Sequence, residues 1–139
     1  MNSSKRKMEF TMQEKIQYLK DFAFNLGEAA QFVPDGECGF GRECVGIQVG
    51  SNWVDYDWDD EGIDAPSNAY HKHPCLAVLG AGEGAISQLF NWCKSLEANG
   101  YDKVVIRENP TLKGVSMQTR QVMAMMGTAM TPQIIKSGA

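Results

Sequence analysis

The sequence lacks any long hydrophobic run. No apolar stretch approaches the ~20 residues that a membrane-spanning helix needs, and the polar segment Met1–Lys7 has no apolar segment behind it. We therefore expect neither a membrane span nor a secretion signal, and we predict a cytoplasmic protein. An excess of basic residues is also missing, because the net charge is −4. Nucleic acids and membrane surfaces bind basic faces, so we expect neither as a partner.

Cysteine is sparse and shows no metal-binding spacing. The chain has four cysteines (Cys38, Cys44, Cys75 and Cys93) and no Cys-x-x-Cys pair. A chain of 139 residues, 43% of them hydrophobic, is large enough to hold a core without a disulfide framework. We therefore interpret all four cysteines as free thiols in a reducing cytosol, and we predict no cofactor.

Hydrophobic periodicity predicts three helices. The segment from Thr11 to Glu14 fits a capping box, and the apolar spacing that follows predicts a helix over 11–32. The same spacing predicts helices over 84–98 and 114–127. We expect the helices to cover the faces of a sheet.

Alternating and continuous apolar runs predict four strands. Alternation on both sides of Gly50-Ser51 predicts an antiparallel hairpin over 44–58 with a type II′ turn. Short apolar runs at 75–79 and 104–107 flank a predicted helix, which indicates a right-handed parallel crossover. The predicted fold class is α/β, with α+β as the alternative: a four-stranded mixed sheet made of one antiparallel hairpin and one βαβ crossover, with three helices.

The domain boundaries follow from these elements. We expect a disordered tail over 1–10, a single domain over 11–131 and a loose C-terminal tail over 132–139. Within the domain, Asp59–Pro74 has no periodic pattern. Long ordered loops in compact domains are often functional, so this loop is a candidate site element.

The turn Gly80–Gly84 is the first candidate site. With Ala85 it matches Gly-x-Gly-x-x-Gly/Ala between a strand and a helix, where glycines let the backbone approach a phosphate. To that extent the segment resembles half of a dinucleotide-binding fold. The other strands of such a fold are missing, and Glu83 opposes an anion, so we expect a smaller anionic molecule or nucleotide. A tight strand–helix connection that binds nothing explains the same residues.

His71, His73 and Cys75 form the second candidate site. If the stretch is extended they share one face, and imidazole and thiolate are the ligands that zinc prefers. A Cys75 thiolate with a histidine base is the nucleophilic alternative. A polar loop that leads into a strand, with Cys75 as a small core residue, also explains them. We group His71 and His73 with Gly80, Gly82 and Gly84 as candidate ligand-binding residues.

An acidic run and a methionine-rich end complete the candidates. Two of the acids between Asp55 and Asp64 suffice for a magnesium site, although a solvated outer face of the hairpin explains them too. Trp53 and Trp92 predict an exposed apolar patch, which would mean association. Methionine adapts to irregular surfaces, so an oligomer or partner interface, as well as core filling, explains the five that crowd the C-terminal part: Met117, Met123, Met125, Met126 and Met130.

Three functions are compatible with these features. The leading hypothesis is a small non-enzymatic binding module that holds an anionic small molecule or nucleotide at Gly80–Gly84, beneath the Asp59–Pro74 loop. One alternative is an interaction or assembly protein of a mobile element or phage, acting through the hairpin and the methionine-rich helix. The other is a small metal-dependent hydrolase or transferase that uses the histidines and Cys75, or the acidic run. No complete catalytic set is evident, so catalytic residues stay unknown. A homo-oligomer or a protein partner is expected.

Overall fold

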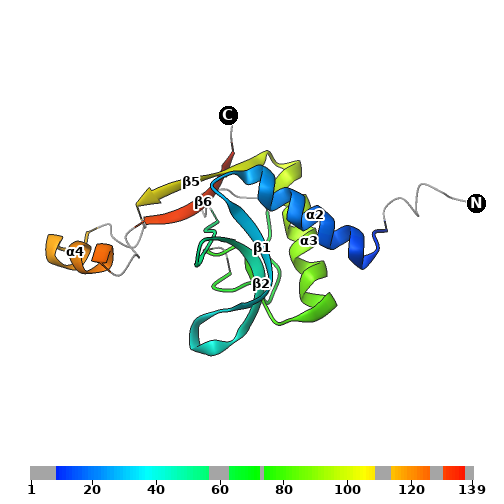
Figure 1. Cartoon of the computed structure of the whole chain (residues 1–139), viewed down its shortest axis with the longest axis horizontal. Helices are drawn as coiled ribbons and strands as arrows, with labels where there is room; N and C mark the ends of the chain where they lie inside the picture. Colours follow the sequence, from blue (N-terminus) through cyan, green and yellow to red (C-terminus); the bar gives the residue numbers. More distant parts are fainter. Residues whose placement is uncertain (1–8, 57–62, 73, 109–113, 126–129, 137–139) are drawn as a thin grey trace, which may run out of the picture.

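The computed structural model describes residues 9–56, 63–72, 74–108, 114–125 and 130–136. Within these residues, three helices, a four-stranded antiparallel sheet and a two-stranded second sheet make an α+β fold (Figure 1). The α+β alternative of the predicted class is therefore confirmed. In chain order the elements are α2 (Met12–Leu26), β1 (Ala30–Glu37), the 3₁₀ turn η1 (Gly39–Gly41), β2 (Glu43–Val49), β3 (Asn52–Trp53), β4 (Ala77–Leu79), α3 (Gly82–Ala98), β5 (Tyr101–Glu108), α4 (Met117–Met125) and β6 (Met130–Lys136).

Helix α2 begins at the predicted capping box but ends earlier than predicted. The Thr11 hydroxyl accepts the N–H of Glu14 (3.1 Å), and the Glu14 carboxylate accepts the N–H of Thr11 (2.8 Å). The helix ends at Leu26 because Gly27 has a φ of +84°, which leaves the helical conformation. The residues from Ala30 onward then form β1. The prediction of a helix over 11–32 was wrong beyond Leu26.

Strand β2 is the centre of the four-stranded sheet. Strand β1 pairs antiparallel with one edge of β2, and β3 and β4 pair antiparallel with the other edge. Strands β2 and β4 approach so closely that a Cβ at Gly46 would lie 2.5 Å from the Leu76 carbonyl oxygen. Only glycine fits at such a contact.

The predicted hairpin is confirmed only around its turn. Strands β2 and β3 pair across Gly50-Ser51, and Gly50 has a φ of +61°, as the first position of a type II′ turn requires. Strand β3 is two residues long, so the second strand of the predicted hairpin over 44–58 is shorter than predicted. The Val54 N–H still donates to the Ile47 carbonyl of β2 (2.9 Å), whereas the N–H groups of Asp55 and Tyr56 donate to Pro132 and Pro74. Residues 57–58 lie outside the described residues.

The predicted parallel crossover between strands at 75–79 and 104–107 was wrong. Strand β4 pairs antiparallel with β2, and β5 pairs antiparallel with β6. Strand β6 occupies residues that we predicted as a loose tail from residue 132. Pro132 has no N–H, which is untypical of a strand, but its carbonyl accepts a hydrogen bond from the Asp55 N–H (2.7 Å).

Residues 54–56, which we call the seam, join the two sheets. The Ile134 N–H donates to the Asp55 carbonyl (3.0 Å), so Asp55 is bonded to β6 through both of its backbone groups. On its other side, Asp55 forms an antiparallel bridge with Cys75, while its bridge to Gln133 is parallel. The seam therefore holds β6 beside the segment that leads into β4.

We call α2, α3 and β1–β4 the body. Helices α2 and α3 pack against each other and against strands of the sheet (Figure 1). Helix α3 begins two residues before the predicted range of 84–98. The body has one main core, in which the side chains with no exposed surface include Leu19, Val45, Ile47, Leu89 and Leu96.

We call β5, α4 and β6 the arm. Its base is anchored in the core by Tyr101 and Ile134, which are 1% and 0% exposed. The ribbon of β5 and β6 leads away from this base, and α4 lies at its far end, apart from α2 and α3 (Figure 1). Helix α4 lies inside the predicted range of 114–127, of which residues 126–127 fall outside the described residues. None of the residues in α4 is buried.

Candidate functional site

The turn Gly80–Gly84 joins β4 to α3, as the sequence predicted. Gly80 and Gly82 have φ values of +118° and +78°, which other residues rarely adopt. The N-cap residue of α3, Ala81, makes no side-chain hydrogen bond. Glu83 lies in the first helical turn, where its charge favours its own helix and opposes a bound anion. The anion site at this turn stays a prediction.

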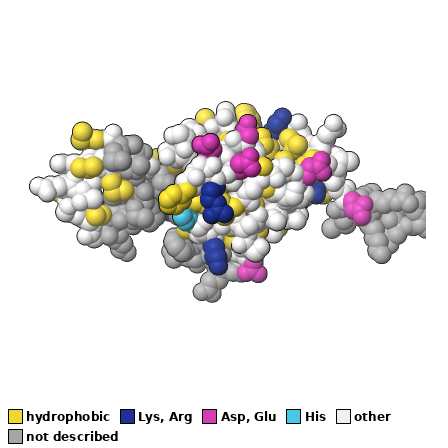
Figure 2. Space-filling model, turned by 90° about the horizontal axis from the view of Figure 1, so that it is seen from below, with side chains coloured by type: hydrophobic (Ala, Val, Ile, Leu, Met, Phe, Trp, Pro, Cys, Tyr) yellow, Lys and Arg dark blue, Asp and Glu magenta, His cyan; other side chains and the backbone are white. Residues whose placement is uncertain are grey.

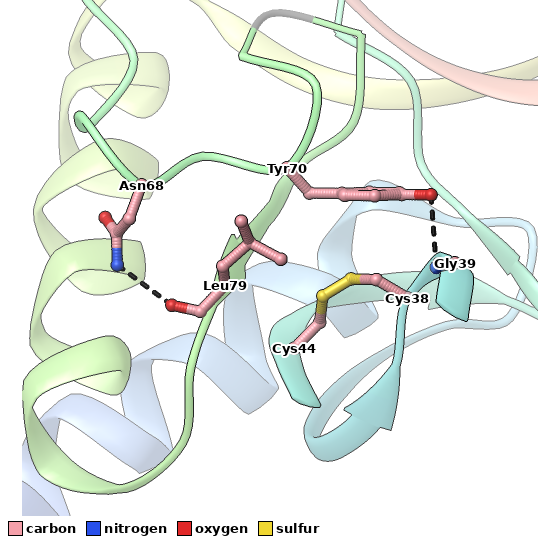
Figure 3. The surroundings of a disulfide bond; sticks show 6 residues. All are labelled: Cys38, Gly39, Cys44, Asn68, Tyr70 and Leu79. Atoms are coloured by element: carbon pink, nitrogen blue, oxygen red, sulfur yellow. Dashed lines mark hydrogen bonds between the residues drawn. A yellow bond between two sulfur atoms is a disulfide. The ribbon is translucent and has the colours of Figure 1, made fainter. Parts of the chain in front are cut away.

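The structure does not bring His71 to this turn. The preceding loop runs antiparallel to β4: Asn68 accepts the N–H of Leu79 (2.8 Å) and donates from Nδ2 to the Leu79 carbonyl (2.9 Å; Figure 3). Ala69 pairs with Val78. Asn68 therefore lies at the turn end of β4, and His71 lies beyond the opposite end. His73 falls outside the described residues.

Cys75 and Asp55 meet at the seam. The Cys75 thiol donates to Asp55 Oδ1 (3.9 Å), and the Thr131 hydroxyl donates to Asp55 Oδ2 (3.2 Å). Burial, with the nearby Asp55 carboxylate, raises the pKa of Cys75 to about 12. Such a thiol stays protonated at neutral pH, so it is a weak nucleophile and a poor metal ligand. Burial also raises the pKa of Asp55 to about 6, although both hydrogen bonds lower it.

No predicted metal site corresponds to a cluster of metal ligands among the described residues. Among the residues that the structure describes, no three His, Cys, Asp or Glu side chains are grouped so as to hold a metal ion. Asp55 and Asp64 are described, whereas Asp57, Asp59, Asp60 and Glu61 are not. The metal-dependent hydrolase or transferase stays a prediction without a described site.

Cys38 and Cys44 form a disulfide (Figure 3). Their Cα atoms are 5.8 Å apart, because η1 reverses the chain between β1 and β2. The Gly39 N–H within that turn donates to the Tyr70 hydroxyl (3.3 Å). The prediction of four free thiols was wrong for this pair, while Cys75 and Cys93 are free.

The tip of the arm, by which we mean α4, exposes large hydrophobic side chains. Met117, Val122 and Met125 in α4 are 69%, 54% and 87% exposed. At 3.6 residues per turn, these positions lie within an arc of about 140° on one side of the helix. In Figure 2 the tip of the arm is on the left. Hydrophobic side chains are visible there, and no charged side chain of a described residue is visible on the face in view. Ile106 and Met130, near the same end of the ribbon, are also exposed.

Helix α4 is short, and the contacts described for it include local hydrogen bonds and one ion pair to β5. It is nine residues long, and isolated helices shorter than about 12–15 residues are marginal in water. The Ser116 hydroxyl accepts the N–H of Thr119 (3.2 Å), and Arg120 forms an ion pair with Glu108 of β5. Exposed ion pairs contribute at most about 1 kcal/mol.

The two tryptophans do not form the exposed patch that we predicted. Trp92 is 2% exposed, and its ring lies 5.9 Å from that of Tyr56. The indole of Trp53 packs against Gly36, where a Cβ would lie 2.6 Å from it. The methionine-rich helix, by contrast, was a sequence signal for the exposed surface that the structure shows.

Comparisons with known proteins add no family to this description. No protein-family model, curated protein or solved structure matches the chain. Within the described residues, no helix has both the length and the apolar character needed to cross a membrane.

Proposed function

We propose that this chain is an interaction protein that assembles through the tip of its arm, with a second copy of the chain as its partner. The observation that carries the proposal is α4, a nine-residue helix with no buried residue. Its exposed apolar side chains Met117, Val122 and Met125 gain from burial against a partner. Packing would also stabilise a helix that is marginal alone.

The charge of the arm tip supports a second copy as the partner. Arg120 is the single charged residue of α4, and Glu108 neutralises it. The side chains beside the apolar ones are Gln118 and Gln121. The described side chains of α4 therefore cause no like-charge repulsion between two copies that meet there, although the whole chain carries a net charge of −4. A twofold axis through such a contact gives a closed dimer.

The exposed edge of β5 does not favour association by strand addition. Asp102, Lys103 and Arg107 are charged and exposed along this strand. Charged side chains on an edge strand oppose pairing with another sheet. We therefore expect side chains of α4, and not backbone groups of β5, to make the contact.

Sedimentation equilibrium tests this proposal. We expect the wild-type mass to rise from monomer to dimer with concentration, weakly, because a small contact gives a transient complex. The variant Met117→Gln/Val122→Gln/Met125→Gln should stay a monomer. The matched control is Phe24→Gln, because Phe24 is 82% exposed on α2, outside the arm. A monomeric wild type at the highest soluble concentration, or a control that loses dimerisation with the arm variant, would contradict the proposal.

The remaining parts of the sequence hypothesis stay predictions. The lack of a side-chain cap at the start of α3 supports an anion at Gly80–Gly84. Glu83 and the position of His71, beyond the other end of β4, oppose one. A mobile-element or phage origin has no structural observation behind it. A cytoplasmic location also stays a prediction, and the disulfide between Cys38 and Cys44 argues for an oxidising compartment.

A further inference from the structure

A pocket at the base of the arm, apart from its tip, has an apolar floor and an acidic rim. It lies where the C-terminal ends of α2 and α3 meet the start of β5 (Figure 1). Its volume is about 200 Å³, which is room for several water molecules at ~30 Å³ each. The floor consists of buried lining residues: Phe22, Leu26 and Tyr101. The rim contains exposed acidic ones: Asp21, Glu97 and Asp102.

The lining of this pocket carries only negative charge. Three of its eight residues are acidic and none is basic. The two helices add to this effect, because the C-terminal end of a helix has a negative partial charge that favours a nearby cation. Neither α2 nor α3 has a basic residue in its last turn. The pocket therefore attracts cations and repels anions.

Two lysines of the chain already lie against aromatic residues of the pocket. Lys94 Nζ is 5.0 Å from the centre of the Tyr18 ring, which also lines the pocket, and 3.7 Å from Glu97 Oε1. Lys136 Nζ is 5.4 Å from the centre of the Tyr101 ring. At such distances an aromatic face attracts a cation. When both lysines are counted, the three rim carboxylates still leave a net negative charge.

Hydrogen bonds hold two of the rim carboxylates in place. The Tyr18 hydroxyl donates to Glu97 Oε1 (2.9 Å) and so links α2 to α3. Gln17 Nε2 donates to Asp21 Oδ1 (2.9 Å) within α2. A carboxylate accepts several hydrogen bonds through its two oxygens, so both groups keep acceptor capacity for a ligand.

The charge and the floor together select among occupants. The three carboxylates oppose an anion. They are not grouped so as to hold a metal ion, and a hydrated metal ion gains nothing from an apolar floor. An organic cation with an apolar stem uses both features. A guanidinium is the best head group, because it is planar, weakly hydrated, stacks on aromatic rings and donates to carboxylates in pairs.

We propose that this pocket binds a small alkylguanidinium, with its alkyl stem on the floor and its planar head hydrogen-bonded to Asp21 and Glu97. The volume of the pocket limits the stem to a few methylene groups. The proposal does not depend on assembly through the tip of the arm, because α4 contributes no residue to the pocket.

Proton–nitrogen NMR of the full chain tests the proposal with matched probes. Propylguanidinium and propylurea have nearly the same shape, but only the first is charged. At constant ionic strength, we expect propylguanidinium to shift the backbone amide resonances of Asn25 and Asp102 saturably, at millimolar concentrations because the rim is exposed to solvent. Propylurea should bind at least tenfold more weakly. Equal binding of propylurea, or no saturable shift with propylguanidinium, would overturn the proposal.

Two double variants separate this pocket from a general attraction of cations to an acidic chain. Asp21→Asn/Glu97→Gln removes two rim charges and keeps the shape of both side chains, so it should weaken propylguanidinium binding at least fivefold. The control, Asp35→Asn/Glu83→Gln, makes the same exchanges at exposed positions outside the pocket and should leave binding unchanged. Undiminished binding in the first variant, or equal losses in both, would contradict the proposed site. The contrast between the two probes on the wild-type chain stands apart from either variant.

Discussion

The body and the tip of the arm differ in how much of their apolar surface the fold buries. In the body, side chains such as Leu19, Ile47 and Leu89 have no exposed surface. In α4, none of the residues is buried, and Met125 is 87% exposed. Hydrophobic burial is the dominant favourable term in folding. The body therefore carries most of the stability that burial provides, while the tip keeps its apolar side chains exposed.

The largest expected effect tests this comparison directly. Leu89→Ala should lower the free energy of unfolding by about 3 kcal/mol, because it removes apolar contacts and leaves a cavity in a packed core. Met125→Ala should change it by less than about 0.5 kcal/mol, because that side chain is exposed. Urea unfolding of the dilute monomer measures both. Similar losses in the two variants would mean that the tip is part of the folding core.

Removing the disulfide should have the next largest effect. Reduction releases a loop in which the cysteines are six residues apart, which costs about 2 kcal/mol by loop entropy. We expect the melting temperature of the body to fall by roughly 5–8 °C in a reducing agent. The double variant Cys38→Ala/Cys44→Ala should melt at one temperature with or without the reductant. Calorimetry that finds the wild type insensitive to reductant would contradict a stabilising role. Self-association through the tip should be unaffected.

The smallest expected effect concerns the seam between body and arm. The pKa of Asp55 is raised to about 6 in the folded chain, so folding favours its protonated form. Its contribution is fully present below the unfolded pKa of about 4 and is lost as pH rises through about 6. Asp55→Asn should therefore gain stability relative to wild type between pH 4 and pH 7. We expect about 1 kcal/mol, because solvent screens a half-buried group.

Urea unfolding at several pH values measures this difference. A gap between Asp55→Asn and wild type that stays constant from pH 4 to pH 7 would show that the carboxylate does not titrate in this range. The neighbouring Thr131→Val removes one hydrogen bond to the carboxylate and keeps the acid. It serves as a control, because its pH profile should retain the loss of stability, moved to a pH somewhat above 6 since the removed hydrogen bond lowers the pKa of Asp55.

Local signals in the sequence predicted local structure well. The capping box at Thr11, the turn at Gly50-Ser51 and the stripe of α3 each depend on residues close together in the chain. The parallel crossover was wrong because strand pairing depends on distant residues. Strand β6 contains Pro132 and follows a predicted helix, so nothing local marked it as the partner of β5. Its pairing with the seam through the Pro132 carbonyl becomes visible only in three dimensions.

The candidate sites follow the same rule. The methionines of α4 marked an exposed apolar surface in the sequence, because the apolar residues of a helix follow one another at short spacing. The sequence also showed no sign of the pocket between α3 and the loop that precedes β4, because Gln88 and Trp92 meet Asp64 only after the loop folds onto the helix. The disulfide was missed as well, because neither spacing nor composition predicted that η1 would bring Cys38 beside Cys44.

Hydrogen–deuterium exchange at two protein concentrations tests the central claim most directly. One concentration should lie below and one above the midpoint of dimerisation measured by sedimentation. We predict that amides in 117–125 become better protected at the higher concentration, while those of α2 and α3 exchange at the same rates. Concentration-independent exchange in α4, or new protection on α2 or α3 instead, would contradict assembly through the tip of the arm.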